Sequence, residues 1–109
     1  MTTSPAPDIT PRELADRLAG DDPPALIDVR EPWEWSRAHI DGARLVPLGE
    51  LRGMAATIPR DRDVVFYCHH GARSRAAVDY LAAQGVRAIN LAGGIDAWSR
   101  EIDPNVPHY

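Results

Sequence analysis

The sequence contains no lysine and a single cysteine, and it has no long run of apolar residues. One cysteine cannot form a disulfide within the chain, so we expect a protein of a reducing compartment, most simply the cytoplasm. The apolar runs are much shorter than the ~20 residues that span a membrane, and residues 1–7 lack the charged and apolar segments of a signal peptide. All twelve basic side chains are arginines, which we attribute to the codon usage of the source genome.

The net charge is −4, so no overall basic field favours binding to nucleic acid or to an anionic membrane. With 109 residues, 44% of them hydrophobic, the chain is long enough for one compact domain. It has no repeats and no low-complexity tract. We expect a flexible arm over 1–8, one folded domain over 9–102 and an irregular tail over 103–109. Nothing in the sequence demands a dimer, so we expect a monomer.

Short strands are predicted to alternate with helices along the chain. The pattern favours strands over 25–29, 44–46, 64–67 and 88–91. It favours a first helix that begins at Pro11 and is stopped by Gly20, and further helices over 33–38, 48–56, 74–84 and 95–100. The first helix carries a capping box, with Thr10 before Pro11 and Glu13. This alternation is typical of an α/β fold with a mainly parallel sheet covered on both faces, in which ligands bind at the carboxyl ends of the strands.

The only thiol of the chain lies at a predicted strand-to-helix turn. Cys68 follows a short apolar strand, and Ser74 is predicted to cap the next helix. The backbone amides of residues 69–74 can converge on one point there. Gly71 can adopt a conformation that other residues avoid, and Arg73 adds a positive charge. The sequence therefore predicts an anion cradle beside Cys68.

A thiol must ionise to act as a nucleophile, and an ordinary cysteine has a pKa of about 8.5. A helix N-terminus, converging amides and a guanidinium all favour the anion. The alternative is a buried structural cysteine, which is the commoner fate of a lone thiol. The glycine and arginine at fixed offsets in the same turn favour the catalytic interpretation.

Four stretches resemble the motifs of rhodanese-like sulfurtransferase domains. They are Ile27–Glu31, His39–Ala43, Cys68–Ser74 and Leu91–Trp98. The resemblance implies a three-layer α/β fold with a central, mainly parallel, five-stranded sheet flanked by helices. It also implies a cofactor-free thiosulfate sulfurtransferase in which Cys68 carries a persulfide. The loop residues expected to bind the persulfide and the donor are His69, His70, Gly71, Ala72, Arg73 and Ser74.

The length of the loop distinguishes this chain from phosphatases. Cell-cycle dual-specificity phosphatases and related arsenate reductases share the fold but have five residues between cysteine and arginine. Here four residues separate Cys68 from Arg73. The resemblance implies that this smaller loop accepts a sulfur atom but cannot surround a phosphate. A phosphatase also needs a general acid for its leaving group, and none can be assigned.

Asp28 and Arg30, at the end of the first long strand, have two interpretations. The resemblance puts them near the active-site loop as supporting residues, whereas their spacing in a buried run also fits a fold-stabilising ion pair. We favour the ion pair. His39 is expected to make a structural hydrogen bond, because sulfur transfer from a thiolate needs no dedicated base. Trp98 is expected in the core.

His69 and His70 are predicted to line the mouth of the pocket and to supply weak, pH-dependent positive charge. No metal is expected, because no set of Cys or His ligands at suitable spacing accompanies them. Trp33 and Trp35 are candidates for an acceptor groove. Arg75 fits equally well as a residue that steers anionic donors and as a solvated surface arginine.

The second functional hypothesis is a sulfur-relay or protein-interaction module that turns over small donors poorly. The tail over 96–109 resembles the end of rhodanese domains fused to adenylyltransferases that activate ubiquitin-like proteins. That resemblance implies a sulfur-carrier protein as a candidate partner, beside a small donor such as thiosulfate or a persulfide.

Overall fold

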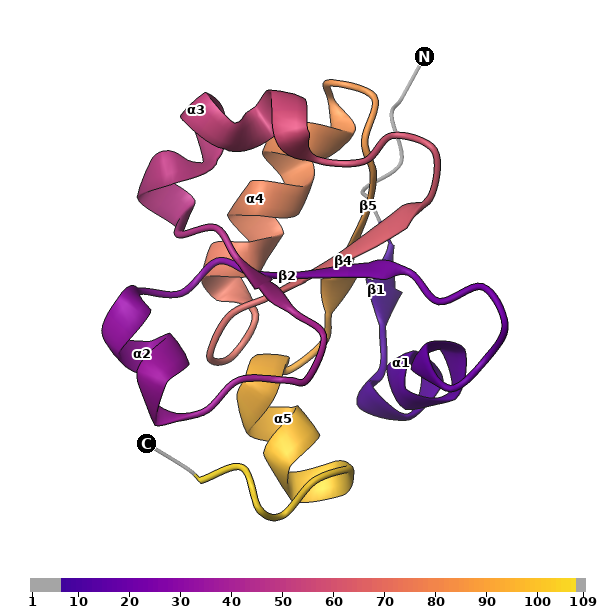
Figure 1. Ribbon diagram of the computed structural model, residues 1–109, viewed down its shortest axis with the longest axis vertical. Coiled ribbons are helices and arrows are strands. Elements are labelled where there is room, and N and C mark those ends of the chain that lie inside the picture. Colours follow the sequence, from indigo (N-terminus) through magenta and orange to yellow (C-terminus); the bar gives the residue numbers. More distant parts are fainter. Residues whose placement is uncertain (1–6, 108–109) are drawn as a thin grey trace.

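The computed structural model describes residues 7–107 and shows a five-stranded, all-parallel sheet between helices (Figure 1). The strands are β1 (Asp8–Ile9), β2 (Ala25–Asp28), β3 (Arg44–Leu45), β4 (Asp63–Tyr67) and β5 (Arg87–Leu91). Their order in the sheet is β1-β5-β4-β2-β3. The helices are α1 (Pro11–Leu18), α2 (Pro32–Arg37), α3 (Leu51–Met54), α4 (Ala72–Ala82) and α5 (Gly94–Glu101), with single 3-10 turns η1 (Leu48–Glu50) and η2 (Ala55–Thr57) on either side of α3. The expected α/β architecture is confirmed.

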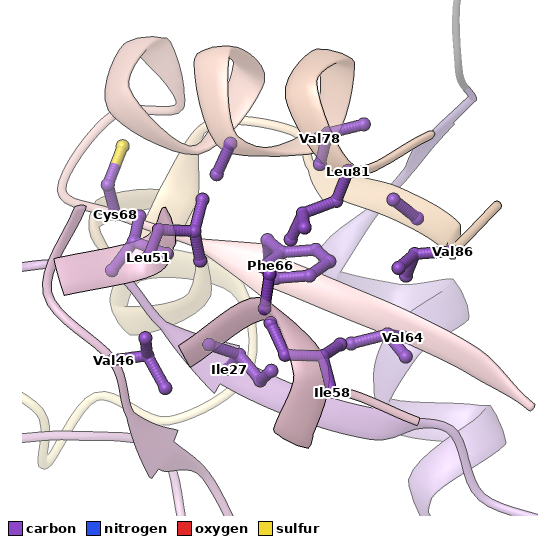
Figure 2. Close-up of a cluster of buried hydrophobic side chains, with 14 residues drawn as sticks. Ile27, Val46, Leu51, Ile58, Val64, Phe66, Cys68, Val78, Leu81 and Val86 are labelled. Atoms are coloured by element: carbon purple, nitrogen blue, oxygen red, sulfur yellow. The ribbon is translucent and has the colours of Figure 1, made fainter. Parts of the chain in front are cut away.

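The two faces of the sheet bury separate hydrophobic clusters. Successive side chains of a strand point to opposite faces. Val64 and Phe66 of β4 accordingly pack into the cluster under α3 and α4, which Figure 2 shows, whereas Val65 and Tyr67 pack into the cluster beside α1 and α5. Cys68, the first residue after β4, belongs to the α4 cluster and is 1% exposed. The end of β4 therefore places the Cys68 thiol at the edge of the hydrophobic core.

Helix α1 begins as its sequence predicts. The Thr10 side chain accepts a hydrogen bond from the Glu13 amide at 3.1 Å, and the Glu13 carboxylate accepts one from the Thr10 amide at 3.0 Å. Pro11 occupies the first helical position. Each partner satisfies a backbone donor that the helix cannot pair itself. Trp98 is likewise in the core as expected, at 7% exposure.

The expected arm over 1–8 is wrong at its boundary, because Asp8 belongs to a strand. β1 pairs with β5, and the amide of Asn90 donates to the carbonyl of Pro7 at 3.0 Å. Arg75 of α4, for which two roles were open, forms an ion pair with Asp8. A strand of two residues is too short to show periodicity, so its stability comes from the β5 edge. The rest of the predicted arm, residues 1–6, lies outside the described residues.

The predicted helix over 48–56 is broken into η1, α3 and η2. Gly49 and Gly53 lie within it, and glycine is a weak helix former. The tail is irregular over 103–107 as expected, but Val106 is buried against the α5 side of the core. Residues 108–109 lie outside the described part. Within 7–107, no helix has the length and apolar character needed to cross a membrane.

Candidate active site

The turn between β4 and α4 is shaped by a glycine in the left-handed region. Gly71 has φ +112° and is the N-cap of α4, so the helix begins at Ala72, two residues earlier than predicted. Ser74 is therefore in the first turn of the helix and does not cap it. A side chain at Gly71 would be strained by its φ, because residues with a Cβ rarely adopt that conformation. The early helix start aims the free amides of the first turn at the end of β4.

The sulfur of Cys68 lies against the donors of this first turn. Its Sγ accepts from the Gly71 amide at 3.1 Å and from the Ser74 amide at 3.4 Å, and the Ser74 hydroxyl oxygen is also 3.4 Å away. Figure 2 shows the sulfur pointing toward the first turn of α4. Two amides and a helix N-terminus favour a negatively charged sulfur at this position.

The N-terminus of α5 closes the other side of the loop. The amide of Ile95 donates to the Cys68 carbonyl at 2.9 Å, and the amide of Asp96 donates to the His69 carbonyl at 3.0 Å. A Cβ built on Gly94 would lie 2.4–2.6 Å from the backbone of residues 68 and 69. No side chain fits in that space, which explains why a glycine is needed there. The loop is thus held from both sides by backbone hydrogen bonds.

Arg73 has an acidic partner that the sequence reasoning missed. Its two terminal nitrogens donate to the two carboxylate oxygens of Glu34 at 2.7 and 2.9 Å. The Glu34 side chain is 4% exposed and that of Arg73 is 38% exposed. Glu34 also accepts from the Glu31 amide as part of the capping of α2, and this local pattern is all that the sequence signals. The positive charge expected at the pocket is therefore compensated at its rim.

Asp28 and Arg30 form an ion pair whose side chains are both fully buried. The guanidinium donates to both carboxylate oxygens at 2.7–3.0 Å and to the Ala38 carbonyl at 2.7 Å. It also lies over the ring of Tyr67, 5.6 Å from its centre. Burial, and after it the negative charge of Asp28, raises the pKa of Tyr67 far above its ordinary value. This geometry fits the fold-stabilising interpretation of the pair.

His69 and His70 stack at the mouth of the loop, with ring centres 3.9 Å apart. Burial, and after it the electrostatic influence of the neighbouring His70, lowers the pKa of His69 below its ordinary value. His70 lies 3.9 Å from Asp96, which also pairs with Arg100. The ligand atoms of His69, His70 and Asp96 fall within 4.8 Å of one another, so these residues have the spacing to hold a metal ion. The sequence reasoning missed Asp96 because it is distant along the chain.

Asn90 is a third residue of the candidate site that the sequence reasoning missed. It is 6% exposed on β5, and its side-chain oxygen lies 2.6 Å from the Ser74 hydroxyl. The signal available in the sequence is a polar residue in an otherwise apolar strand. A buried amide is costly unless it is hydrogen-bonded, so its position calls for an explanation.

The tryptophans proposed for an acceptor groove differ in their surroundings. Trp33 on α2 is 60% exposed, next to Glu34 in the sequence. Trp35 stacks on His39, with ring centres 3.6 Å apart, and His39 Nδ1 forms a hydrogen bond with the Trp35 carbonyl at 3.0 Å. His39 thus has the structural hydrogen bond expected of it.

Comparison with known proteins gives concordant matches. The sequence profile of the rhodanese-like domain matches residues 10–101. The chain is 44% identical over 105 residues to the probable adenylyltransferase/sulfurtransferase MoeZ of Mycobacterium tuberculosis, an alignment that covers 93% of this chain but only 26% of MoeZ. It is 43% identical over 94 residues to a sulfurtransferase of Allochromatium vinosum, covering 85% of this chain and 88% of that protein. The solved structure of a rhodanese-like domain protein from Staphylococcus aureus superposes with a TM-score of 0.81 at 32% identity, covering 84% of this chain and 90% of that one.

Proposed function

The chain belongs to the rhodanese-like family of sulfurtransferases, and we propose that it carries sulfane sulfur on Cys68 as a persulfide. The donor is a small sulfur compound such as thiosulfate, and the acceptor is a thiophile: cyanide in vitro, a thiol or a carrier protein. We further propose a monomer acting in the cytoplasm without a cofactor. The observation that carries the proposal is the pair of backbone amides, of Gly71 and Ser74, that donate to the Cys68 sulfur at 3.1 and 3.4 Å.

The reaction takes two steps in which electrons balance without a redox partner. In the first, the Cys68 thiolate attacks the outer sulfur of thiosulfate; the S–S bond of the donor breaks, sulfite leaves with the electron pair, and a cysteine persulfide forms. In the second, the acceptor attacks the outer sulfur, and the bond to Cys68 breaks to regenerate the thiolate. The amides of Gly71 and Ser74 stabilise the anionic sulfur in both resting forms.

The length of the loop supports sulfur transfer over phosphate chemistry. Four residues separate Cys68 from Arg73, and the first turn of α4 closes over a single sulfur atom. We assign no neighbouring side chain as a base, because the Gly71 and Ser74 amides at the helix N-terminus are placed to stabilise the attacking sulfur. Phosphate-ester hydrolysis that depends on Cys68 would contradict this assignment.

A second candidate function is sulfur relay from a partner protein. Glu34 compensates the charge of Arg73, which weakens the attraction of the rim for a small dianion such as thiosulfate. MoeZ combines adenylyltransferase and sulfurtransferase in its name, and the present chain spans about a quarter of that protein. A sulfur-carrier protein is therefore a reasonable acceptor for this chain as well.

The test is production of thiocyanate from thiosulfate and cyanide. Wild type should turn over with ping-pong kinetics, and Cys68→Ser should lose the activity entirely. Arg12→Ala is the matched control, because Arg12 is exposed on α1. If Cys68→Ser produced thiocyanate as fast as wild type, the enzyme assignment would be overturned. Sulfur uptake from a cysteine desulfurase but not from thiosulfate would favour the relay.

A further inference from the structure

The hydroxyl of Ser74 has one proton and three acceptors within reach. The Asn90 side-chain oxygen is 2.6 Å from Ser74 Oγ, the Gly71 carbonyl oxygen is 3.2 Å away, and the Cys68 sulfur is 3.4 Å away. A hydroxyl donates only one hydrogen bond at a time. The shortest of the three distances is typical of a strong O–H···O bond, so the proton points to Asn90.

Asn90 is held rigidly enough to direct that proton. Its backbone pairs with Phe66 of β4 on one side and with Asp8 of β1 on the other, and its amide donates to the Pro7 carbonyl. Its side chain is buried at the α4 face, within 3.7 Å of where a Cβ on Gly71 would lie. The Asn90 oxygen therefore stays on one side of the Ser74 hydroxyl and accepts its proton from a fixed direction.

We infer that Asn90 is a positioning residue that competes with the Cys68 sulfur for the Ser74 proton. The inference rests on the proposed function, because the ionised Cys68 sulfur is the reacting group only if Cys68 carries the transferred sulfur. With Asn90 present, the Cys68 sulfur accepts from the amides of Gly71 and Ser74, while the Ser74 hydroxyl donates to the Asn90 side-chain oxygen. Asn90 thereby sets, through Ser74, how readily the sulfur ionises.

Removing the Asn90 acceptor leaves the Gly71 carbonyl and the Cys68 sulfur within reach of the Ser74 proton. An ionised sulfur is the stronger attractor of the two because it is charged, so we expect the hydroxyl to donate to it. In Asn90→Leu the side chain keeps a similar shape but has no polar atom to accept the proton. We expect the midpoint of the pH profile for alkylation of Cys68 by iodoacetamide to fall by about one pH unit, the effect of one hydrogen bond to an anion. Asn90→Asp retains the acceptor and adds negative charge, so its midpoint should rise instead.

The opposite signs distinguish positioning from loss of structure, since local unfolding would move both variants the same way. Ser74→Ala provides the second check, because the Asn90→Leu shift must disappear in that background if Asn90 acts through the hydroxyl. Apart from the carboxylate that Asn90→Asp introduces, the same charged groups surround the loop in every variant, so differences between variants report on position 90. These groups are His69, His70, Arg73, Arg75, Glu34, Asp96, Asp28, Arg30 and Asp8.

An unchanged or raised midpoint in Asn90→Leu would overturn the inference, as would a shift that persists without the Ser74 hydroxyl. If Asn90→Leu fails to fold, Asn90→Asp alone decides: a midpoint that does not rise contradicts the inference. Alkylation requires no sulfur donor. Failure of this test is therefore distinct from failure of the sulfurtransferase assignment, which the thiocyanate assay measures.

Discussion

Two of the arginine–carboxylate pairs near the candidate active site differ in exposure and in the sequence separation of their partners. Asp28 and Arg30 are two residues apart and both side chains are 0% exposed. Glu34 and Arg73 are 39 residues apart, and Arg73 is 38% exposed. The first pair is enclosed by β2, Tyr67 and the segment after α2, whereas the second joins α2 to the active-site loop at its rim. From this difference we expect the first pair to matter chiefly for stability and the second chiefly for the active-site loop.

The largest effect is expected from breaking the enclosed pair. Asp28→Ala leaves the buried Arg30 guanidinium without its carboxylate, so we expect the free energy of unfolding to fall by about 3–5 kcal/mol. Urea unfolding followed by circular dichroism measures it. The isosteric Asp28→Asn should cost less, because its side-chain oxygen still accepts a hydrogen bond. A loss below that of an ordinary surface substitution would show that the pair does not support the fold.

Breaking the rim pair from the arginine side should affect activity more than stability. We expect Arg73→Ala to remain folded and to load sulfur from thiosulfate about tenfold more slowly, the equivalent of one charge-assisted hydrogen bond. Stopped-flow loading measures the rate, and Arg12→Ala is the control. An unchanged loading rate would remove Arg73 from the donor-binding residues.

Breaking the same pair from the carboxylate side should act in the opposite direction. Glu34→Gln keeps the hydrogen-bonding shape but removes the negative charge, so the uncompensated Arg73 should attract a dianionic donor more strongly. We expect kcat/KM for thiosulfate to rise by about threefold to tenfold, and the rise to shrink with added salt. Glu50→Gln, an exposed acidic residue of η1, is the matched control. A fall in kcat/KM would mean that Glu34 serves to position Arg73 and not to offset its charge.

The parts of the fold that the sequence predicted are those with local causes. The capping box of α1 depends on Thr10 and Glu13, three residues apart, and it forms as expected. The period-two pattern of β4 likewise sorts Phe66 and Tyr67 to opposite faces. β1 has only two residues and gains its hydrogen bonds from β5, so no local pattern marks it.

The same distinction holds in the candidate site. Cys68, Gly71 and Ser74 lie within seven residues of one another, and their arrangement follows from the strand-to-helix turn. Glu34 and Asn90 come from other segments of the chain. In its local sequence Glu34 has the pattern of a helix-capping acid, and Asn90 has that of a polar residue interrupting an apolar strand. Their contacts with the loop depend on how α2 and β5 pack against it, which only the folded chain defines.

The most direct test of the central claim, that Cys68 carries the sulfur, is the intact mass of the protein after brief incubation with thiosulfate and removal of the donor. Wild type should gain the mass of one sulfur atom and lose it when cyanide is added, with release of thiocyanate. Cys68→Ser should gain nothing. A wild-type chain that gains no sulfur from thiosulfate or from any persulfide donor, or a Cys68→Ser chain that gains the same mass, would contradict the account.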